Sequence, residues 1–265
     1  MRLQIFNFSA LFFRSILRAT AFAGMVWGAS VCAATVHVAV AANFAAPLKA
    51  IAADFERVTG HTVVTSSAST GKLYSQITNA APFDVLMAAD DETPARLQRD
   101  GLAVADTRFT YAVGRLALWS ADSALVDAKG EVLKLGKFAR LAIASPTAAP
   151  YGVAAIETLR KLNLFNLLEP KLVTGESIAQ AYSFVASGNV PLGFVALSQV
   201  MEVTQQGSKL KSGSMWRVPA DLHTALKQDA VLLTRGRSNA GAIAFLEFLK
   251  TEASRNTIRS FGYEI

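Results

Sequence analysis

Short apolar segments alternate with segments of helical periodicity along the first part of the chain, and this alternation is the strongest constraint on its fold. Residues 35–41, 62–66 and 83–89 are apolar or β-branched and have the length of buried strands. The segments between and after them place apolar residues three and four positions apart, as an amphipathic helix does. Such an alternation indicates a mostly parallel sheet that is covered by helices on both faces.

The pattern starts again later in the chain, where strands are expected at 141–144, 171–173 and 191–196. The extended segment 109–119 is interpreted as a connection rather than as another unit of the first sheet. A second extended segment, 225–234, is expected to cross back. We therefore predict an α/β fold of two lobes, each a mostly parallel sheet flanked by helices, with a ligand cleft between the lobes. The predicted boundaries are 35–115 for the first part of lobe I, 116–227 for lobe II and 228–265 for the return segment of lobe I.

Residues 1–34 have the character of a secretory signal peptide. Three arginines precede the apolar run 19–27, which is too short to span a bilayer, and small residues follow it. We expect this peptide to be cleaved near Ala33 or Ala34 and the mature chain to be exported. Cys32, the single cysteine, lies within this segment. The mature chain therefore has no thiol for a disulfide, a nucleophile or a thiolate metal site.

The charge balance argues against an extensive cationic surface. The formal net charge of +6 arises from 26 basic and 20 acidic residues, and the predicted signal peptide holds three basic residues and no acidic one. The mature chain then has 23 basic and 20 acidic residues, a balance of +3. Nucleic-acid-binding proteins usually gather basic residues on one face, so a polyanion is not the expected partner. The histidines, His37, His61 and His223, are far apart in the sequence, predict no metal site and are expected to be exposed or at strand edges.

Four turns from a strand into a helix share one character. They lie at 42–44, 69–71, 150–152 and 176–178, two in each predicted lobe. For any one of them, the simplest interpretation is that Ser and Thr side chains cap the next helix. In parallel α/β sheets, however, ligands bind beyond the carboxyl ends of the strands, where the first turns of helices present unpaired N–H groups. Together the turns predict a pocket of neutral donors, which favours a fully ionised tetrahedral dianion over hydrogen phosphate.

The mature chain resembles the periplasmic molybdate-binding proteins of ABC-type importers, a branch of the type II periplasmic binding proteins. The resemblance implies a periplasmic, monomeric protein of two lobes. It also implies molybdate or tungstate as the ligand, delivery to an inner-membrane ABC permease with its ATPase, and neither a cofactor nor a catalytic residue. Molybdenum would be present only within the bound oxyanion. The matching segments are 38–44, 67–73, 81–90, 144–152, 191–195 and the ending Phe261-Gly-Tyr-Glu-Ile265.

The resemblance also implies a set of oxyanion-binding residues. Asn43 matches a Ser or Asn that gives a backbone and a side-chain donor, and Thr70, with Ser69 beside it, matches a Ser in the second turn. Tyr151 and Ile178 match positions that give backbone N–H groups. Some members carry a Tyr hydroxyl donor where this chain has Ala196, and the hydroxyl of Tyr151 is a candidate to replace it. The choice between molybdate and tungstate stays open.

Two alternatives remain at this point. One is a binding protein for another tetrahedral dianion such as sulfate. The other is a serine acyl-enzyme of the penicillin-binding or β-lactamase type, because Ser69 and Lys72 have the S-x-x-K spacing and looser matches follow at 187–189 and 211–213. The third enzyme motif should lie on a strand, whereas the segment 207–214 is rich in turn residues. The sequence therefore favours the binding protein.

Overall fold

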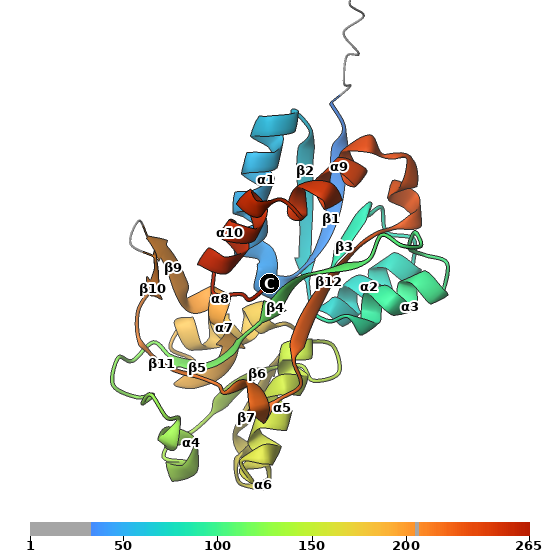
Figure 1. Cartoon of the computed structure of the whole chain (residues 1–265). Helices are drawn as coiled ribbons and strands as arrows, with labels where there is room; N and C mark the ends of the chain where they lie inside the picture. The colour runs from blue at the N-terminus through green and yellow to red at the C-terminus, as the bar shows by residue number, and fades with distance from the viewer. Residues whose placement is uncertain (1–32, 205–206) are drawn as a thin grey trace, which may run out of the picture. The chain divides into compact units, whose positions relative to one another are not determined.

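The computed structural model describes residues 33–204 and 207–265 (Figure 1). Residues 33–265 form one compact unit. The predicted signal peptide lies outside the described residues except for Ala33 and Ala34. None of the helices in the described ranges combines the length and the apolar character needed to cross a bilayer.

The first sheet has five strands in the order β2-β1-β3-β12-β4. The pairs β1–β2 and β1–β3 are parallel, whereas β12 pairs antiparallel with both β3 and β4. Four strands thus share one direction and β12 runs against them. The strands are β1 (Thr35–Ala41), β2 (Thr62–Ala68), β3 (Val85–Met87), β4 (Phe109–Gly114) and β12 (Leu226–Leu232).

The second sheet repeats this arrangement in the order β11-β5-β8-β6-β7. The strands β6, β7 and β8 are parallel, and β5 pairs antiparallel with β8 and with β11. Again four strands share one direction, and the opposed strand is β5. This confirms the predicted α/β fold with mostly parallel sheets. The strands are β5 (Leu116–Ser120), β6 (Leu141–Ala144), β7 (Leu172–Gly175), β8 (Leu192–Ala196) and β11 (Ser214–Arg217).

Helices cover both faces of the first sheet, which explains why its strands are apolar on both sides. In β1, Val36, Val38 and Val40 belong to one hydrophobic cluster with α1 (Ala45–Thr59), α9 (Ala240–Leu249) and α10 (Glu252–Ser260). Ala39, between them, belongs to a second cluster with α2 (Thr70–Thr78) and α3 (Glu92–Arg99). Successive side chains of a strand point to opposite faces, so both faces of β1 are buried.

The second sheet is covered in the same way. Leu116 and Leu118 of β5 pack in a cluster with α4 (Glu131–Leu135), α5 (Pro150–Lys161) and α6 (Phe165–Leu168). Ala117 and Trp119 pack in another cluster with α7 (Ile178–Ala186) and α8 (Leu197–Val200). The remaining elements are η1 (Ala42–Phe44), η2 (Glu169–Lys171), η3 (Ala220–Leu222), η4 (Thr234–Ser238) and the hairpin strands β9 (Met201–Thr204) and β10 (Gly207–Leu210).

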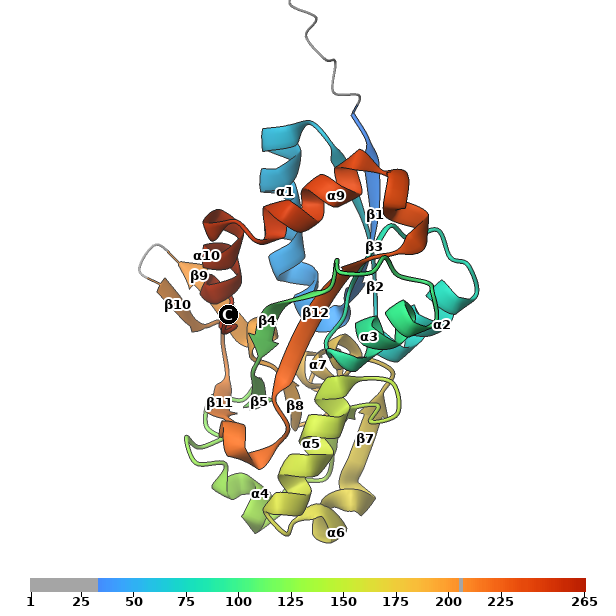
Figure 2. The same ribbon diagram turned by 45° about the vertical axis from the view of Figure 1, so that its right-hand side comes forward.

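Two chain crossings join the lobe built on the first sheet to the lobe built on the second. The chain passes from β4 to β5 through Arg115 alone, and it returns from β11 through η3 to β12. Figure 2 shows β12 beside β4 on one side of this junction and β5 beside β11 on the other. These two crossings are the covalent links between the sheets in the part of the chain that the structure describes.

Several sequence expectations are wrong in detail. The segment 109–119 is more than a connection, because its first half forms β4 at the edge of the first sheet. The sequence predicts a loop over 145–152 and a helix over 153–162. The helix α5 begins at Pro150 instead, so Tyr151 lies in its first turn. The turn-rich segment 207–214 contains β10. The spacing of Ile243, Leu246 and Leu249 predicts one buried helix face, but Ile243 is 46% exposed.

Candidate oxyanion site

A small pocket lies where the four strand-to-helix turns meet. It has a volume of about 10 Å³, which suits only a small ion or molecule. The structure brings all five residues of the expected oxyanion set to this one pocket, which we call the inner pocket. The residues that line it are Ala41, Ala42, Asn43, Ser69, Thr70, Ala89, Ala149, Pro150, Tyr151 and Ile178.

The first turns of three helices form much of the wall of the inner pocket. Thr70 begins α2, Tyr151 is the second residue of α5, and Ile178 begins α7. Within the described part of the chain, the backbone N–H groups of these three residues make no hydrogen bond to another residue. First-turn N–H groups have no partner inside their helix, and the helix dipole adds a partial positive charge there. The wall is therefore suited to an anion without any Lys or Arg.

The hydroxyl residues at the start of α2 do not act as ordinary helix caps. Ser69 occupies the position before the helix and is 5% exposed, but its side chain accepts no capping hydrogen bond. Thr70 Oγ1 accepts a hydrogen bond from the N–H of Ala89 at 3.0 Å. A hydroxyl that accepts one bond still has its hydrogen to donate. Both side chains thus add donors to the pocket, which the capping interpretation of this turn did not include.

Asn43 holds the pocket wall through its side chain. An Asn just before a helical segment predicts an N-terminal cap, here for α1. Asn43 instead lies within η1, and its amide Nδ2 donates to Gln228 Oε1 at 2.9 Å and to the Tyr263 hydroxyl at 3.0 Å. The capping role is therefore wrong. The amide hydrogens are used inside the protein, which leaves the backbone N–H of Asn43 as its donor for an anion. Removing the amide would also take one hydrogen bond from each of these two buried partners.

Tyr151 reaches from α5 to the strands at the junction of the lobes. Its side chain is 1% exposed, and its hydroxyl accepts a hydrogen bond from Gln228 Nε2 at 3.1 Å. A Cβ atom at Gly114 would lie 2.2 Å from this hydroxyl, so only glycine leaves room for it at the end of β4. Burial raises the pKa of Tyr151 well above its usual value, and the phenol stays neutral.

A buried hydrogen-bond network behind the pocket joins the two lobes. The Tyr111 hydroxyl donates to the backbone oxygen of Ala88 at 2.9 Å and also contacts Gln228 Oε1 at 3.1 Å. Ser198 Oγ of α8 donates to the backbone oxygen of Asn43 at 2.9 Å. Burial raises the pKa of Tyr263 to about 12, so this hydroxyl also stays protonated.

The sequence reasoning missed this network, because its members carry little local signal. Gln228 and Asp229 follow the exposed Lys227 in the middle of β12, and both are at most 1% exposed. Polar residues in the middle of a buried strand need partners, and that was the available indication. Tyr263 lies within the matching C-terminal segment, but nothing in the segment indicates its contact with Asn43.

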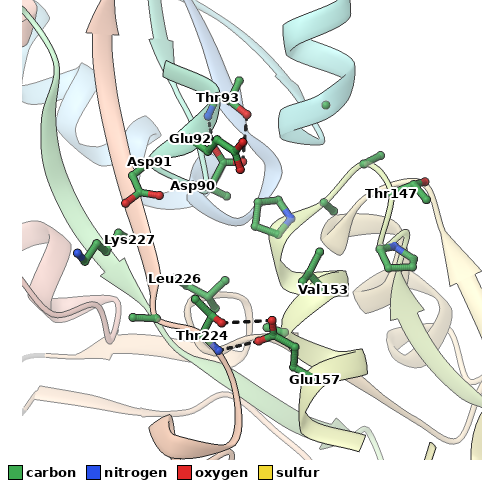
Figure 3. Close-up of a pocket in the computed structure, with 18 residues that line it drawn as sticks. Asp90, Asp91, Glu92, Thr93, Thr147, Val153, Glu157, Thr224, Leu226 and Lys227 are labelled. Atoms are coloured by element: carbon green, nitrogen blue, oxygen red, sulfur yellow. Dashed lines mark hydrogen bonds between the residues drawn. The ribbon is translucent and has the colours of Figure 1, made fainter. Parts of the chain in front are cut away.

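A larger pocket of about 340 Å³ adjoins the inner one, and we call it the outer pocket (Figure 3). Its lining includes four carboxylates, Asp90, Asp91, Glu92 and Glu157, and one ammonium group, Lys227. The excess of carboxylates repels anions. The inner pocket is therefore the candidate oxyanion site although it is much smaller.

Two of the acidic side chains of the outer pocket, Asp90 and Glu157, have hydrogen-bond partners from the protein itself. Asp90 accepts hydrogen bonds from the N–H and the hydroxyl of Thr93 at 2.8 and 3.2 Å. Burial nevertheless raises the pKa of Asp90, because desolvation outweighs these two bonds. Glu157 accepts a bond from the N–H of Thr224 at 2.6 Å. Figure 3 shows these two bonded groups on opposite sides of the pocket.

The described residues contain no group of three His, Cys, Asp or Glu side chains placed to hold a metal ion. Two of the histidines differ from the expectation that they are exposed, since His61 and His223 are each 5% exposed. His61 Nδ1 accepts a hydrogen bond from the N–H of Ala34 at 3.1 Å, which is a structural role.

The residues of the acyl-enzyme alternative do not form a catalytic group. Lys72 is 58% exposed in its side chain, and its amine lies 3.8 Å from Glu176. Lys211 Nζ donates to the backbone oxygen of Gln199, and Ser187 Oγ donates to that of Phe184. Neither lysine is found in hydrogen-bond contact with Ser69 among the described residues. An S-x-x-K enzyme needs a base beside its serine, so this arrangement does not support one.

Comparison with known proteins places the chain and its fold in a family. The model of the family described as "Bacterial extracellular solute-binding protein" matches residues 36–264. The chain belongs to this family. Among its relatives, Molybdate-binding protein ModA of Azotobacter vinelandii is 54% identical over 231 residues, which cover 87% of this chain and 90% of the relative. Molybdate-binding protein ModA of Rhodobacter capsulatus is 51% identical over 254 residues, which cover 95% and 98%.

Solved structures agree with this membership. The periplasmic molybdate-binding protein of Azotobacter vinelandii has a TM-score of 0.83 and 38% identity, over 87% of this chain and 99% of that one. The sulfate-binding protein SubI of Mycobacterium tuberculosis has a TM-score of 0.71 at 12% identity, over 87% and 86%, and therefore shows the shared fold alone. These relatives confirm the resemblance to molybdate-binding proteins that the sequence segments indicated.

Proposed function

We propose that the protein captures molybdate, and also tungstate, in the inner pocket and delivers it to an ABC importer in the inner membrane. The observation that carries the proposal is the convergence of three helix first turns with unpaired N–H groups on one small pocket. The names of the relatives supply the oxyanion. The working location is the periplasm, where a predicted signal peptide would direct the chain.

A shell of neutral donors selects its anion by protonation state and by size. Oxygens of a fully ionised tetrahedral dianion accept hydrogen bonds from N–H and O–H groups in every direction. Hydrogen phosphate would bring an O–H that needs an acceptor, and an unpaired buried hydroxyl is unfavourable. About six charge-assisted hydrogen bonds, each worth roughly 1.5–3 kcal/mol before ordering costs, are sufficient for sub-micromolar binding.

Binding is coupled to closure of the lobes. The donors of Asn43 and Thr70 come from the lobe built on the first sheet, and those of Tyr151 and Ile178 come from the lobe built on the second. The anion therefore binds fully only when the lobes approach one another, and it shifts the population toward the closed form. The importer would distinguish loaded from empty protein by this closure. The protein acts as a monomeric carrier and makes no covalent change to its ligand.

Calorimetric titration of the purified mature chain with molybdate, tungstate, sulfate and phosphate tests the proposal. We expect sub-micromolar dissociation constants for molybdate and tungstate, weaker binding of sulfate and no measurable binding of phosphate. If sulfate bound more tightly than molybdate, the proposed ligand would be wrong, and the result would support the alternative of another tetrahedral dianion. Tight phosphate binding without a response to molybdate would overturn the proposal.

A further inference from the structure

The two lobes are joined beside the inner pocket by a hydrogen bond between backbone atoms. The N–H of Gly71, in the first turn of α2, donates to the backbone oxygen of Ala148 at 2.9 Å. Gly71 belongs to the lobe of the first sheet, whereas Ala148 lies between β6 and α5 in the other lobe. We call this contact the interlobe clasp.

The two residues of the clasp line two larger pockets. Gly71 and Ala148 both line the outer pocket, and both also line another pocket of about 610 Å³. Their sequence neighbours Thr70 and Ala149 line the inner pocket. The clasp is thus one residue away from the expected oxyanion donors in each lobe. Any change in its length shifts the first turn of α2 relative to the first turn of α5.

Close approach, rather than backbone conformation, explains why residue 71 is glycine. Gly71 does not have the positive φ angle that favours glycine. A Cβ atom at this position would lie 3.1 Å from both the Cα and the oxygen atom of Ala148, closer than ordinary van der Waals contact. Alanine is a better helix former than glycine. The helix alone would therefore favour alanine here, and the contact between the lobes favours glycine.

We propose that Gly71 is a positioning residue for the bound anion. The clasp holds the first turns of α2 and α5 at the separation at which donors of both lobes reach one oxyanion. It forms when the lobes close and breaks when they open. This role rests on the proposed oxyanion function, because it concerns the same pocket.

The variant Gly71→Ala separates this role from a role in the helix. We expect molybdate binding to weaken about tenfold, as for the loss of one interlobe hydrogen bond, with faster dissociation. We also expect the ligand-free variant to melt at the same or a higher temperature than the wild type, because alanine favours the helix. Affinity within twofold of the wild type would overturn the proposal. A large drop in the melting temperature of the ligand-free variant would also overturn it.

Lys72→Ala is the matched control. Lys72 is the next residue of α2, and its exposed amine pairs with Glu176 across the lobes at 3.8 Å. An exposed ion pair of this kind contributes little. We expect its molybdate affinity to stay within about twofold of the wild type. If Lys72→Ala weakened binding as much as Gly71→Ala, general contact between the lobes would explain both effects, and the clasp would lose its special role.

Amide hydrogen exchange of the wild type provides a readout that does not depend on the proposed ligand. Lys72 lies in the same first turn of α2, and its N–H has no hydrogen-bond partner among the described residues. The N–H of Gly71 should therefore exchange at least tenfold more slowly than the N–H of Lys72. If the wild type bound none of the four oxyanions, the proposed function would fail while a protected Gly71 amide would still support the clasp. Equal exchange of the two amides, both without a ligand and at saturating molybdate, would overturn the clasp.

Discussion

Ser69 and Ser177 occupy the same position, the residue before the first turn of a helix, but they use their hydroxyls differently. Ser177 accepts a hydrogen bond from the N–H of Gln180 at 3.3 Å and caps α7. Ser69 makes no such bond and is buried at the inner pocket. Without a capping hydrogen bond, Ser69 does not contribute the stability that a serine usually gives at this position. At the residue scale, this difference leaves the hydroxyl of Ser69, beside Thr70, available to the proposed ligand.

Thr70→Ala tests the donor role of this hydroxyl. The variant removes a donor to the anion, so we expect molybdate affinity to fall about tenfold or more. It also leaves the N–H of Ala89 unpaired, which costs about 1–3 kcal/mol of stability. Calorimetry measures the first effect and denaturant unfolding the second. Thr70→Ser retains the hydroxyl and should behave like the wild type; a serine variant as weak as the alanine variant would contradict the donor role.

At the scale of elements, local sequence patterns were sufficient for the segments that form the pocket. The strands and helices around residues 35–79 follow from hydrophobic periodicity, because each helix packs on the strand beside it in sequence. For α7, the spacing of apolar residues predicts a helix over 178–186, and the observed bounds are Ile178–Ala186. The convergence of the four turns follows from the rule that ligands bind at the carboxyl ends of parallel strands.

Non-local pairing set the limit of prediction from sequence. The strand β4 looked like a connection because its partner, β12, comes more than a hundred residues later. The same distance hides the contacts of Asn43, since Gln228 and Tyr263 lie 185 and 220 residues away in sequence. Nothing near Asn43 indicates that its amide is used inside the protein. The residues of the site were therefore within reach of the sequence, but the division of their donors between ligand and protein was not.

The turn between β3 and α3 carries a carboxylate whose burial makes stability depend on pH. Desolvation raises the pKa of Asp90 in the folded state above its usual value of 3.8. Below pH 3.8 the carboxyl group is protonated in both the folded and the unfolded state. As pH rises toward the higher pKa of the folded state, the unfolded state releases its proton first, and the folded state loses stability. Asp90→Asn removes the charge and can keep both contacts with Thr93. We expect the variant to gain stability relative to the wild type between pH 4 and pH 7.

Denaturant unfolding of Asp90→Asn and of the wild type at a series of pH values measures this difference. Asp91→Asn is a matched control, because Asp91 is an exposed neighbour at the same turn. Its stability relative to the wild type should change little over the same range. A constant difference between Asp90→Asn and the wild type from pH 4 to pH 7 would contradict the raised pKa.

At the scale of the whole described chain, the two sheets have the same arrangement of strand directions. Residues of both lobes line the candidate site. Each sheet has four strands of one direction and one opposed strand, and the opposed strands β12 and β5 both adjoin the crossings between the lobes. The buried network of Tyr111, Gln228, Tyr151 and Tyr263 lies along this junction. In the proposed function, closure of the lobes would assemble the anion pocket beside this polar network, to which both lobes contribute.

A crystal structure of the protein with molybdate, with the molybdenum located by its anomalous scattering, tests the central claim most directly. The account predicts one strong peak in the inner pocket, with oxyanion oxygens within hydrogen-bond distance of the backbone N–H groups of Thr70, Tyr151 and Ile178. It also predicts the Gly71–Ala148 hydrogen bond in the same crystal. A peak in the acidic outer pocket, or an oxyanion held by Lys or Arg side chains, would contradict it.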